Sequence, residues 1–331
     1  MKTTISDIAE YTGYSKATIS LVLNDSARIP LSTKKKIRKV ISELGYHPNL
    51  LARTFAQQRS MTIGVVLPHV KHHLFSDPYF AEAISGISRG INGSGYKILF
   101  LVSNDNFINS EALELFKTKG IDGYIFIGAT MEDRYITGLK SAGCPVIMIN
   151  NSLSGNVPSV NIDNYTGARQ MVNYLAGRGY KKIAFMRGIE TTLSGIERYK
   201  GFKDAMLENG LEPDAENIFY GDFSEEKAYN IIISKPEIDF EALFAASDYM
   251  AIGAIRALKQ RGLRVPTDVA VVGADNIHLG EYISPRLTTI EQPIFRASEE
   301  CVKSFISSIQ GEENSVKPDV MHTKLVIRES G

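Results

Sequence analysis

One short segment places small polar, cationic and apolar side chains where they could read a surface of hydrogen-bonding groups. Within residues 3–24, TTISDIAEYTGYSKATISLVLN, Ser15 can cap a helix in which Ile19, Val22 and Leu23 turn inward. The side chains left pointing outward near its start are Lys16, Ala17, Ser20 and Leu21. The base edges of a DNA major groove present acceptors, donors and methyl groups that such side chains can contact.

The elements around this segment complete a small helical head. Ile5, Ile8 and Ala9 share one face of a preceding helix, and Gly13 ends it. Ser32 or Thr33 can cap a third helix over 32–45, whose apolar face carries Ile37, Val40, Ile41 and Leu44. The pattern predicts a helix-turn-helix, although two short helices of an ordinary globular protein would show the same periodicity.

Charge separates this head from the rest of the chain. The 331 residues have a formal net charge of zero. Residues 1–59, however, contain ten Lys and Arg and four Asp and Glu, an excess of six positive charges. A basic head on an acidic body is typical of a DNA-binding module, because phosphate contacts supply much of the affinity. The alternative for the run 34–39 is a solvated helix face.

Composition narrows the other possibilities. The chain is 44% hydrophobic and 22% charged, which is typical of a folded protein with substantial cores. It shows no apolar run long enough for a membrane span and no signal peptide, so we expect a cytoplasmic location. Cys144 and Cys301 lie far apart in apolar surroundings, which favours buried thiols over a disulfide or a metal site.

From residue 61 onward, short apolar strands alternate with helices. The predicted strands lie at 63–68, 96–103, 123–128, 145–150, 181–188, 217–222, 241–247 and 269–276. The predicted helices lie at 79–92, 110–119, 131–142, 165–177, 198–209, 224–234 and 249–261. This alternation predicts two α/β lobes with parallel, doubly wound sheets. A ligand of such lobes binds beyond the carboxyl ends of the strands.

Taken together, many ordered segments make the chain resemble the lactose/galactose repressor (LacI/GalR) family of bacterial transcriptional regulators. The segments include ISDIAEYTGYSKATISLVLN, YHPNLLARTF, GRGYKKIAFMRG, FAASDYMAIGAIRAL and GLRVPTDVAVVGADN. The resemblance implies an all-α helix-turn-helix head joined to a two-lobed, periplasmic-binding-protein-like α/β core. It also implies a homodimer, most simply a repressor, that reads a pseudo-palindromic double-stranded DNA operator under control of a small-molecule effector.

The same resemblance suggests domain boundaries. We expect the DNA-binding domain at 1–46, the hinge helix and linker at 47–60, the first lobe at 61–160 plus about 292–320, and the second lobe at 161–291 plus about 321–331.

Residues that contact DNA can be carried over by position. Phosphate-contacting and helix-fixing positions of the family match Thr4, Ser15, Thr18 and Asn24, and its base-reading positions match Lys16, Ala17 and Leu21. In the hinge, Asn49 lies at a backbone position and Ala52 and Arg53 at minor-groove positions. Phe55 stands where the family usually has a leucine that enters a base step, and a phenylalanine is a similar apolar wedge. The alternative is that Phe55 belongs to an ordinary helix core.

The effector positions follow in the same way. They are Asp77, Tyr79, Phe80, Ser103, Asn150, Asn151, Arg198, Ser247 and Asp275. Arg198 offers a planar fork of donors, and Asp275 accepts hydrogen bonds from hydroxyls or amines. For Tyr79 and Phe80 a core role remains open, and for Arg198 and Asp275 a structural ion pair.

Further departures from the family pattern and two rival functions complete the expectations. Leu21 replaces an arginine of many members, so the operator should differ at that base. Asn150 and Asn151 replace charged residues of sugar-binding relatives, and Ser247 replaces an asparagine, which weakens the case for a sugar. A sugar or sugar derivative is still favoured as the effector, and a nucleobase stays open. The cluster of His69, His72 and His73 suggests an exposed loop, so we predict no metal and no cofactor. The rivals are a solute-binding protein with a fused head and a sugar-modifying enzyme. The absence of leucine heptads predicts a dimer, not a tetramer.

Overall fold

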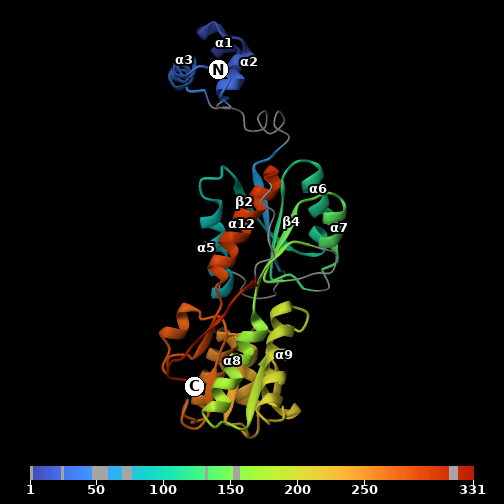
Figure 1. Ribbon diagram of the computed structural model, residues 1–331, viewed down its shortest axis with the longest axis vertical. Helices are drawn as coiled ribbons and strands as arrows, with labels where there is room; N and C mark the ends of the chain where they lie inside the picture. The colour runs from blue at the N-terminus through green and yellow to red at the C-terminus, as the bar shows by residue number, and fades with distance from the viewer. Residues whose placement is uncertain are drawn as a thin grey trace. The chain divides into compact units, whose positions relative to one another are not determined.

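The computed structural model describes residues 3–23, 26–46, 59–68, 77–130, 133–151, 157–312 and 320–331. It divides into two compact units, Met1–Ser60 and Met61–Gly331. Figure 1 shows the smaller unit as helices and the larger one as strands covered by helices. In the described ranges no helix is both long and apolar enough to cross a membrane.

The smaller unit contains short helices around one core, as predicted. They are α1 (Ile5–Thr12), α2 (Lys16–Leu23) and α3 (Leu31–Glu43). Gly13 ends α1 with a φ of 71°, a left-handed conformation that glycine adopts readily. Ile8, Ile19, Val22 and Ile37 are at most 1% exposed. Each such burial stabilises the head by roughly 1.5–3 kcal/mol.

The start of α3 differs from the prediction. Ser32 or Thr33 was expected to cap this helix, but α3 begins at Leu31. Pro30 occupies the cap position with a φ of −57° and makes no side-chain hydrogen bond. Because proline has a fixed φ, it sets the chain for a helix without a polar cap. The predicted cap is therefore wrong, and both hydroxyl residues lie inside the first turn.

The first lobe of the larger unit is built on a six-stranded parallel sheet with the order β11-β5-β4-β3-β1-β2. Its strands are β1 (Thr62–Pro68), β2 (Lys97–Ser103), β3 (Gly123–Ile127), β4 (Val146–Ile149), β5 (Ser159–Ile162) and β11 (Val320–Met321). Its helices are α5 (Pro78–Ile91), α6 (Ala112–Lys117), α7 (Tyr135–Ser141) and α12 (Ile294–Gln310), and a π-helical turn, η1 (Phe107–Glu111), precedes α6.

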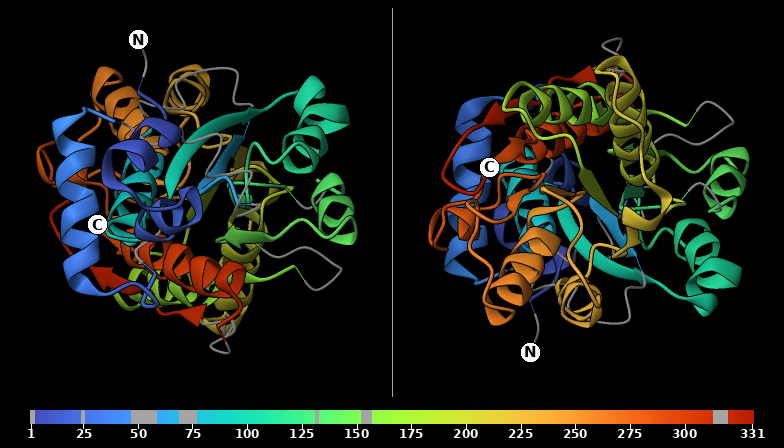
Figure 2. Two further views of the ribbon diagram at one scale, coloured as in Figure 1. Left: turned by 90° about the horizontal axis from the view of Figure 1, so that it is seen from above. Right: turned by 90° about the horizontal axis from the view of Figure 1, so that it is seen from below.

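The central strands β3 and β4 are buried on both faces, so alternate residues belong to different cores. Ile125 packs with α5 and α12, whereas Tyr124 and Phe126 pack with η1, α6 and α7. Figure 2 shows α6 and α7 on the side of the sheet away from α12. Gly86 lets α5 approach α12 closely, because an added Cβ would lie 2.1 Å from the carbonyl oxygen of Phe295.

The second lobe has a four-stranded parallel sheet with the order β7-β6-β8-β9. Its strands are β6 (Ile183–Arg187), β7 (Ile218–Tyr220), β8 (Ala242–Ala245) and β9 (Ala270–Val272). Its helices are α8 (Asn164–Gly177), α9 (Leu193–Glu208), α10 (Glu225–Ser234) and α11 (Asp248–Gln260), with the short 3-10 turns η2 (Ala215–Asn217) and η3 (His278–Glu281). An antiparallel pair, β10 (Thr289–Glu291) and β12 (Lys324–Val326), adjoins it.

The chain crosses between the lobes where elements of one sheet are followed by elements of the other. In the described ranges this happens after β5, after β10 and after β11. The predicted division at residues 160 and 161 falls inside β5, which ends at Ile162. Polar side chains at these crossings are therefore placed between the two hydrophobic cores. Both cysteines are buried and free, as predicted.

Candidate DNA-reading surface and interlobe site

The hydroxyl groups predicted to fix the head do so. Ser15 Oγ accepts a hydrogen bond from the backbone N–H of Thr18 at 3.1 Å and lies 2.9 Å from the Thr18 hydroxyl. Thr4 and Asp7 form a reciprocal capping box, in which the Thr4 N–H donates to the carboxylate at 2.7 Å. These hydrogen bonds lower the pKa of Asp7. The beginnings of α1 and α2 are thus held by their own side chains.

The remaining face of α2 is available for recognition. Lys16 and Ala17 are exposed, Leu21 is 37% exposed and Ser20 is half-buried. The predicted division of α2 into inward and outward sides is confirmed. The outward side presents one cation and mostly apolar groups, which suits contacts with phosphate and with thymine methyl groups.

The basic run on α3 is only partly solvated. Lys35, Lys36, Arg38 and Lys39 are exposed, whereas Lys34 is buried at 7% exposure. The exposed Lys35 and Lys36 are cations of the kind that attract phosphate groups.

Several predicted positions lie outside the described residues. They are Asn24, Asn49, Ala52, Arg53 and Phe55 among the DNA contacts, and the cluster of His69, His72 and His73. In the described part of the chain no group of His, Cys, Asp or Glu is arranged to hold a metal ion.

In the second lobe, the guanidinium of Arg198 is buried, and each of its three nitrogens donates a hydrogen bond. Its Nε donates to Asn164 Oδ1 at 3.0 Å, and its Nη2 donates to Asp275 Oδ1 at 3.0 Å. Its Nη1 donates to the carbonyl oxygen of Ala246. This geometry depends on the close approach of α9 to α8, since a Cβ at Gly201 would lie 2.4 Å from a backbone oxygen of α8.

Asp275 follows β9 in an unusual backbone conformation. Its φ is 125°, which side-chain-bearing residues rarely adopt, and its N–H donates to Ile290 O at 2.8 Å. Gln292 donates to its carboxylate from the crossing after β10. Burial raises the pKa of Asp275 to about 8, while Arg198 opposes this shift.

The first lobe contributes the other end of this arrangement. Asn150, directly after β4, donates to Tyr79 Oη at 3.1 Å and to Gln292 Oε1 at 3.4 Å. Its own oxygen accepts from Asn164 Nδ2 at 3.0 Å. Burial raises the pKa of Tyr79 to about 12, so its hydroxyl stays protonated. We call the connected set the interlobe network; its members are Tyr79, Asn150, Asn164, Arg198, Asp275 and Gln292.

Other predicted effector residues make local hydrogen bonds or ring contacts nearby. Asp77 accepts a hydrogen bond from the N–H of Tyr79 at 3.0 Å and caps α5, and Ser247 likewise caps α11. Asn151 donates to the carbonyl oxygen of Ala129. Phe80 is half-buried, and its ring packs edge-on against Tyr79 with centroids 5.5 Å apart.

Ser103 lies farther along the same sheet edge, where it is hydrogen-bonded to Tyr135. It is not joined to the interlobe network by any hydrogen bond described in the structure.

Asn164 and Gln292 were missed from the sequence. Both are buried, at 2% and 6% exposure, and both stand just after a strand that leads to the other lobe. The rule that ligands bind beyond the carboxyl ends of strands could have identified them.

The fold and these two surfaces define a class of protein: a DNA-binding regulator whose helical head is joined to a two-lobed ligand-binding core. Residues 4–49 match the model of bacterial regulatory proteins of the lacI family, and residues 172–331 match a periplasmic binding protein-like domain. The chain is 30% identical over 335 residues to the HTH-type transcriptional regulator CelR of Thermobifida fusca, covering 99% of this chain and 98% of that protein. The chain therefore belongs to the lacI family of bacterial regulatory proteins.

Solved structures agree. The Lac repressor dimer bound to operator and the anti-inducer ONPF matches with a TM-score of 0.85 and 25% identity, covering 100% of this chain and 99% of that one. The complex of the transcriptional regulator CelR with cellobiose matches with a TM-score of 0.76 and 29% identity, covering 99% and 100%. The predicted family, fold class and function as a DNA-binding transcriptional regulator are confirmed, and the enzyme and solute-binding alternatives are not favoured.

The raised pKa of Asp275 predicts how stability depends on pH. From about pH 4 to about pH 8 the folded chain holds a proton that the unfolded chain releases, so the free energy of unfolding falls as pH rises. Asp275→Asn removes this group, so its urea midpoint should decline less than that of the natural protein between about pH 6.5 and 8.5. Asp105→Asn, at an exposed position, is the control. Equal declines in all three proteins would contradict the prediction.

Proposed function

We propose that a small polyhydroxylated effector, a sugar or sugar derivative, binds at the interlobe network and controls the affinity of the head for its operator. The observation that carries this proposal is that buried hydrogen bonds join Asn150 of the first lobe to Arg198 and Asp275 of the second through Asn164 and Gln292. Amide, guanidinium and carboxyl groups together offer both donors and acceptors, as sugar hydroxyls do. The CelR–cellobiose complex supports a sugar in this class of core.

The predicted contacts of the effector fall into two groups. Polar contacts come from the network and from Asp77, Ser103, Asn151 and Ser247, and aromatic contacts come from Tyr79 and Phe80. An aromatic face beside polar groups also suits a nucleobase, which remains the second candidate.

The mechanism we propose is a population shift. The hydrogen bonds between the lobes favour one lobe arrangement. An effector that replaces these bonds with its own contacts changes the populations of the lobe arrangements. The lobe arrangement then sets how paired heads are spaced and whether residues 48–56 form hinge helices. In those helices Phe55 is the proposed wedge, flanked by Ala52 and Arg53, with Asn49 near the DNA backbone.

We further propose that the operator differs from the family's usual one. Lys16, Ala17 and Leu21 are the proposed base-reading residues, with Ser20 beside them, and Thr4, Ser15, Thr18 and Asn24 are the proposed backbone contacts. The exposed Leu21 cannot bind guanine in bidentate fashion, so contact with a thymine methyl group is the chemistry it offers. Because its proposed operator is chromosomal DNA, we propose that the protein acts in the cytoplasm at the nucleoid.

A homodimer is the proposed assembly, and β2 offers a surface for it. This strand is the edge of the six-stranded sheet, and its Leu99, Phe100 and Val102 are 39–42% exposed. A long apolar edge strand favours association unless it is covered. The operator-bound Lac repressor dimer supports a second copy of the chain as the partner.

Leu21→Arg tests the base-reading assignment. Arginine can bind guanine O6 and N7, so a binding selection should enrich guanine at one base pair of each half-site, with a discrimination of about 1–3 kcal/mol. Leu31→Arg adds the same charge at a position that is 75% exposed on α3 and is the matched control. It should raise affinity for all sequences without changing the selected base. An unchanged preference in Leu21→Arg would rule out the assignment.

Arg198→Lys tests the effector site. We expect calorimetric titration with cellobiose, other sugars, nucleosides and phosphorylated sugars to identify a ligand, first without and then with operator. Lysine cannot reproduce the planar fork of Arg198, so the affinity should fall at least about tenfold. Arg256→Lys, whose parent side chain is 55% exposed and pairs with Glu225, should bind as the natural protein does. Equal affinity in both variants would place the ligand elsewhere.

Phe100→Glu tests the dimer surface. A charge on the exposed face of β2 should shift the sedimentation coefficient from dimer to monomer at the same concentration, because an unpaired charge would be buried against the second copy. Leu207→Glu, at a 61% exposed position of α9, is the control and should stay dimeric. A dimeric Phe100→Glu, or a tetramer in the natural protein, would be inconsistent with this assembly.

A further inference from the structure

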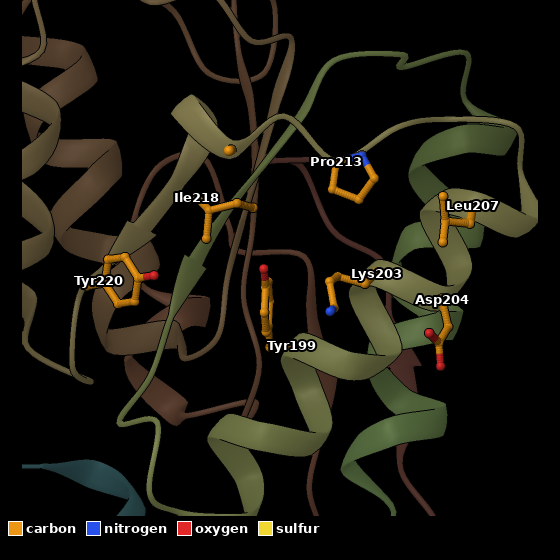
Figure 3. A pocket seen from close by; sticks show the side chains of 8 residues that line it. Tyr199, Lys203, Asp204, Leu207, Pro213, Ile218 and Tyr220 are labelled. Atoms are coloured by element: carbon orange, nitrogen blue, oxygen red, sulfur yellow. The ribbon is translucent and has the colours of Figure 1, made fainter.

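A second pocket lies in the second lobe, formed by different residues from those of the interlobe network. It has a volume of about 430 Å³, within the range of small-molecule sites. Figure 3 shows it between α9 and the segment that leads into β7. It is lined by Tyr199, Lys203, Asp204, Leu207, Pro213, Ala215, Ile218 and Tyr220.

Two successive residues of α9 belong to the interlobe network and to the second pocket. Arg198 is buried in the interlobe network, whereas Tyr199 lines the pocket beside Lys203 and Ile218 (Figure 3). Lys203 follows one turn later on the same face of the helix. The pocket therefore has an aromatic wall next to an exposed cation.

Cations are concentrated around this aromatic wall. The guanidinium carbon of Arg187 lies 3.8 Å from the ring centroid of Tyr199 and 5.3 Å from that of Tyr220. The Lys203 Nζ lies 5.1 Å from the Tyr199 centroid. Arg187 Nε is buried and has no hydrogen-bond partner among the residues that the structure describes. Its Nη1 pairs with Glu190 at 2.7 Å, so the remaining edge of the guanidinium is not fully used.

The acidic residue at the rim is already engaged. Asp204 accepts a hydrogen bond from the hydroxyl of Tyr165, a residue of α8, at 2.9 Å. Its carboxylate also lies 3.5 Å from Lys200 Nζ. Among the described residues Lys203 forms no ion pair with a carboxylate. The pocket thus presents the Lys203 ammonium group beside an apolar floor that includes Pro213 and Ile218.

We propose that this pocket binds a small molecule that combines a flat ring with an anionic substituent. The ring would pack beside Tyr199 against Pro213 and Ile218, and the anion would bind Lys203 and a tyrosine hydroxyl. This site is separate from the proposed effector site and does not depend on it. Because α9 also carries Arg198, a ligand here contacts the helix that holds the interlobe network.

Phenyl phosphate, titrated into the full chain and followed by ligand-detected NMR, is the probe. We expect saturable binding that weakens about tenfold in Lys203→Gln, since a charge-assisted hydrogen bond is lost. Lys200→Gln is the matched control, because Lys200 is on the same helix but lies over the Tyr165 ring at 4.5 Å. Benzoate should compete, which tests carboxylate against phosphate as the anion. Inorganic phosphate and phenol should each bind more weakly than the combined probe.

The opposing results are equally definite. Absence of saturable binding, equal affinity in Lys203→Gln and the natural protein, or inorganic phosphate binding as tightly as phenyl phosphate would each overturn the proposal. Loss of binding in Asp275→Asn with retention in Lys203→Gln would place the probe in the interlobe network instead. Tyr199→Leu provides a second variant, in which the gain in affinity of phenyl phosphate over inorganic phosphate should fall. Thermal unfolding checks that this variant is folded.

Discussion

The burial of the Arg198 guanidinium is the constraint on which the larger unit depends. Removing such an ion from water costs several kcal/mol unless its donors are satisfied. Asn164, the carbonyl oxygen of Ala246 and Asp275 supply acceptors from three different elements. Losing one of them would leave a buried donor of this guanidinium without a hydrogen bond, at a cost of about 1–3 kcal/mol. The close helix packing at Gly201 and the positive φ of Asp275 accompany this arrangement.

The same need for satisfied hydrogen bonds around Arg198 fits the neutral side chain of Asn150, which the first lobe contributes to the network. Asn150 joins the network with both ends of its amide, donating to Tyr79 and accepting from Asn164. A carboxylate at this position could not donate, and it would add a negative charge near Asp275, whose pKa is already raised by burial. The departure of this chain from charged residues at 150 and 151 thus fits the hydrogen bonds that the structure contains.

Much of the architecture could be predicted from the sequence, because buried parallel strands and amphipathic helices leave strong periodic signals. The predicted alternation of strand and helix and the inward face of α2 are confirmed. The polar site was harder to predict, since caps and ligand contacts use the same short side chains. Ser247 follows β8 as expected and Asp77 directly precedes α5, and both residues cap helices. Asn164 and Gln292 were missed because their role depends on lobe crossings that are set by tertiary packing.

The order of the strands has a consequence for synthesis and folding of the chain. The second lobe's sheet is complete once β9 has been made, and its strands and helices are contiguous in sequence. The first lobe instead needs α12 and β11, and α12 supplies Val302 and Phe305 to a core begun more than two hundred residues earlier at Ile63. An incomplete nascent chain therefore exposes an unfinished apolar surface in its first lobe. The lobe made first is the lobe that must wait to fold.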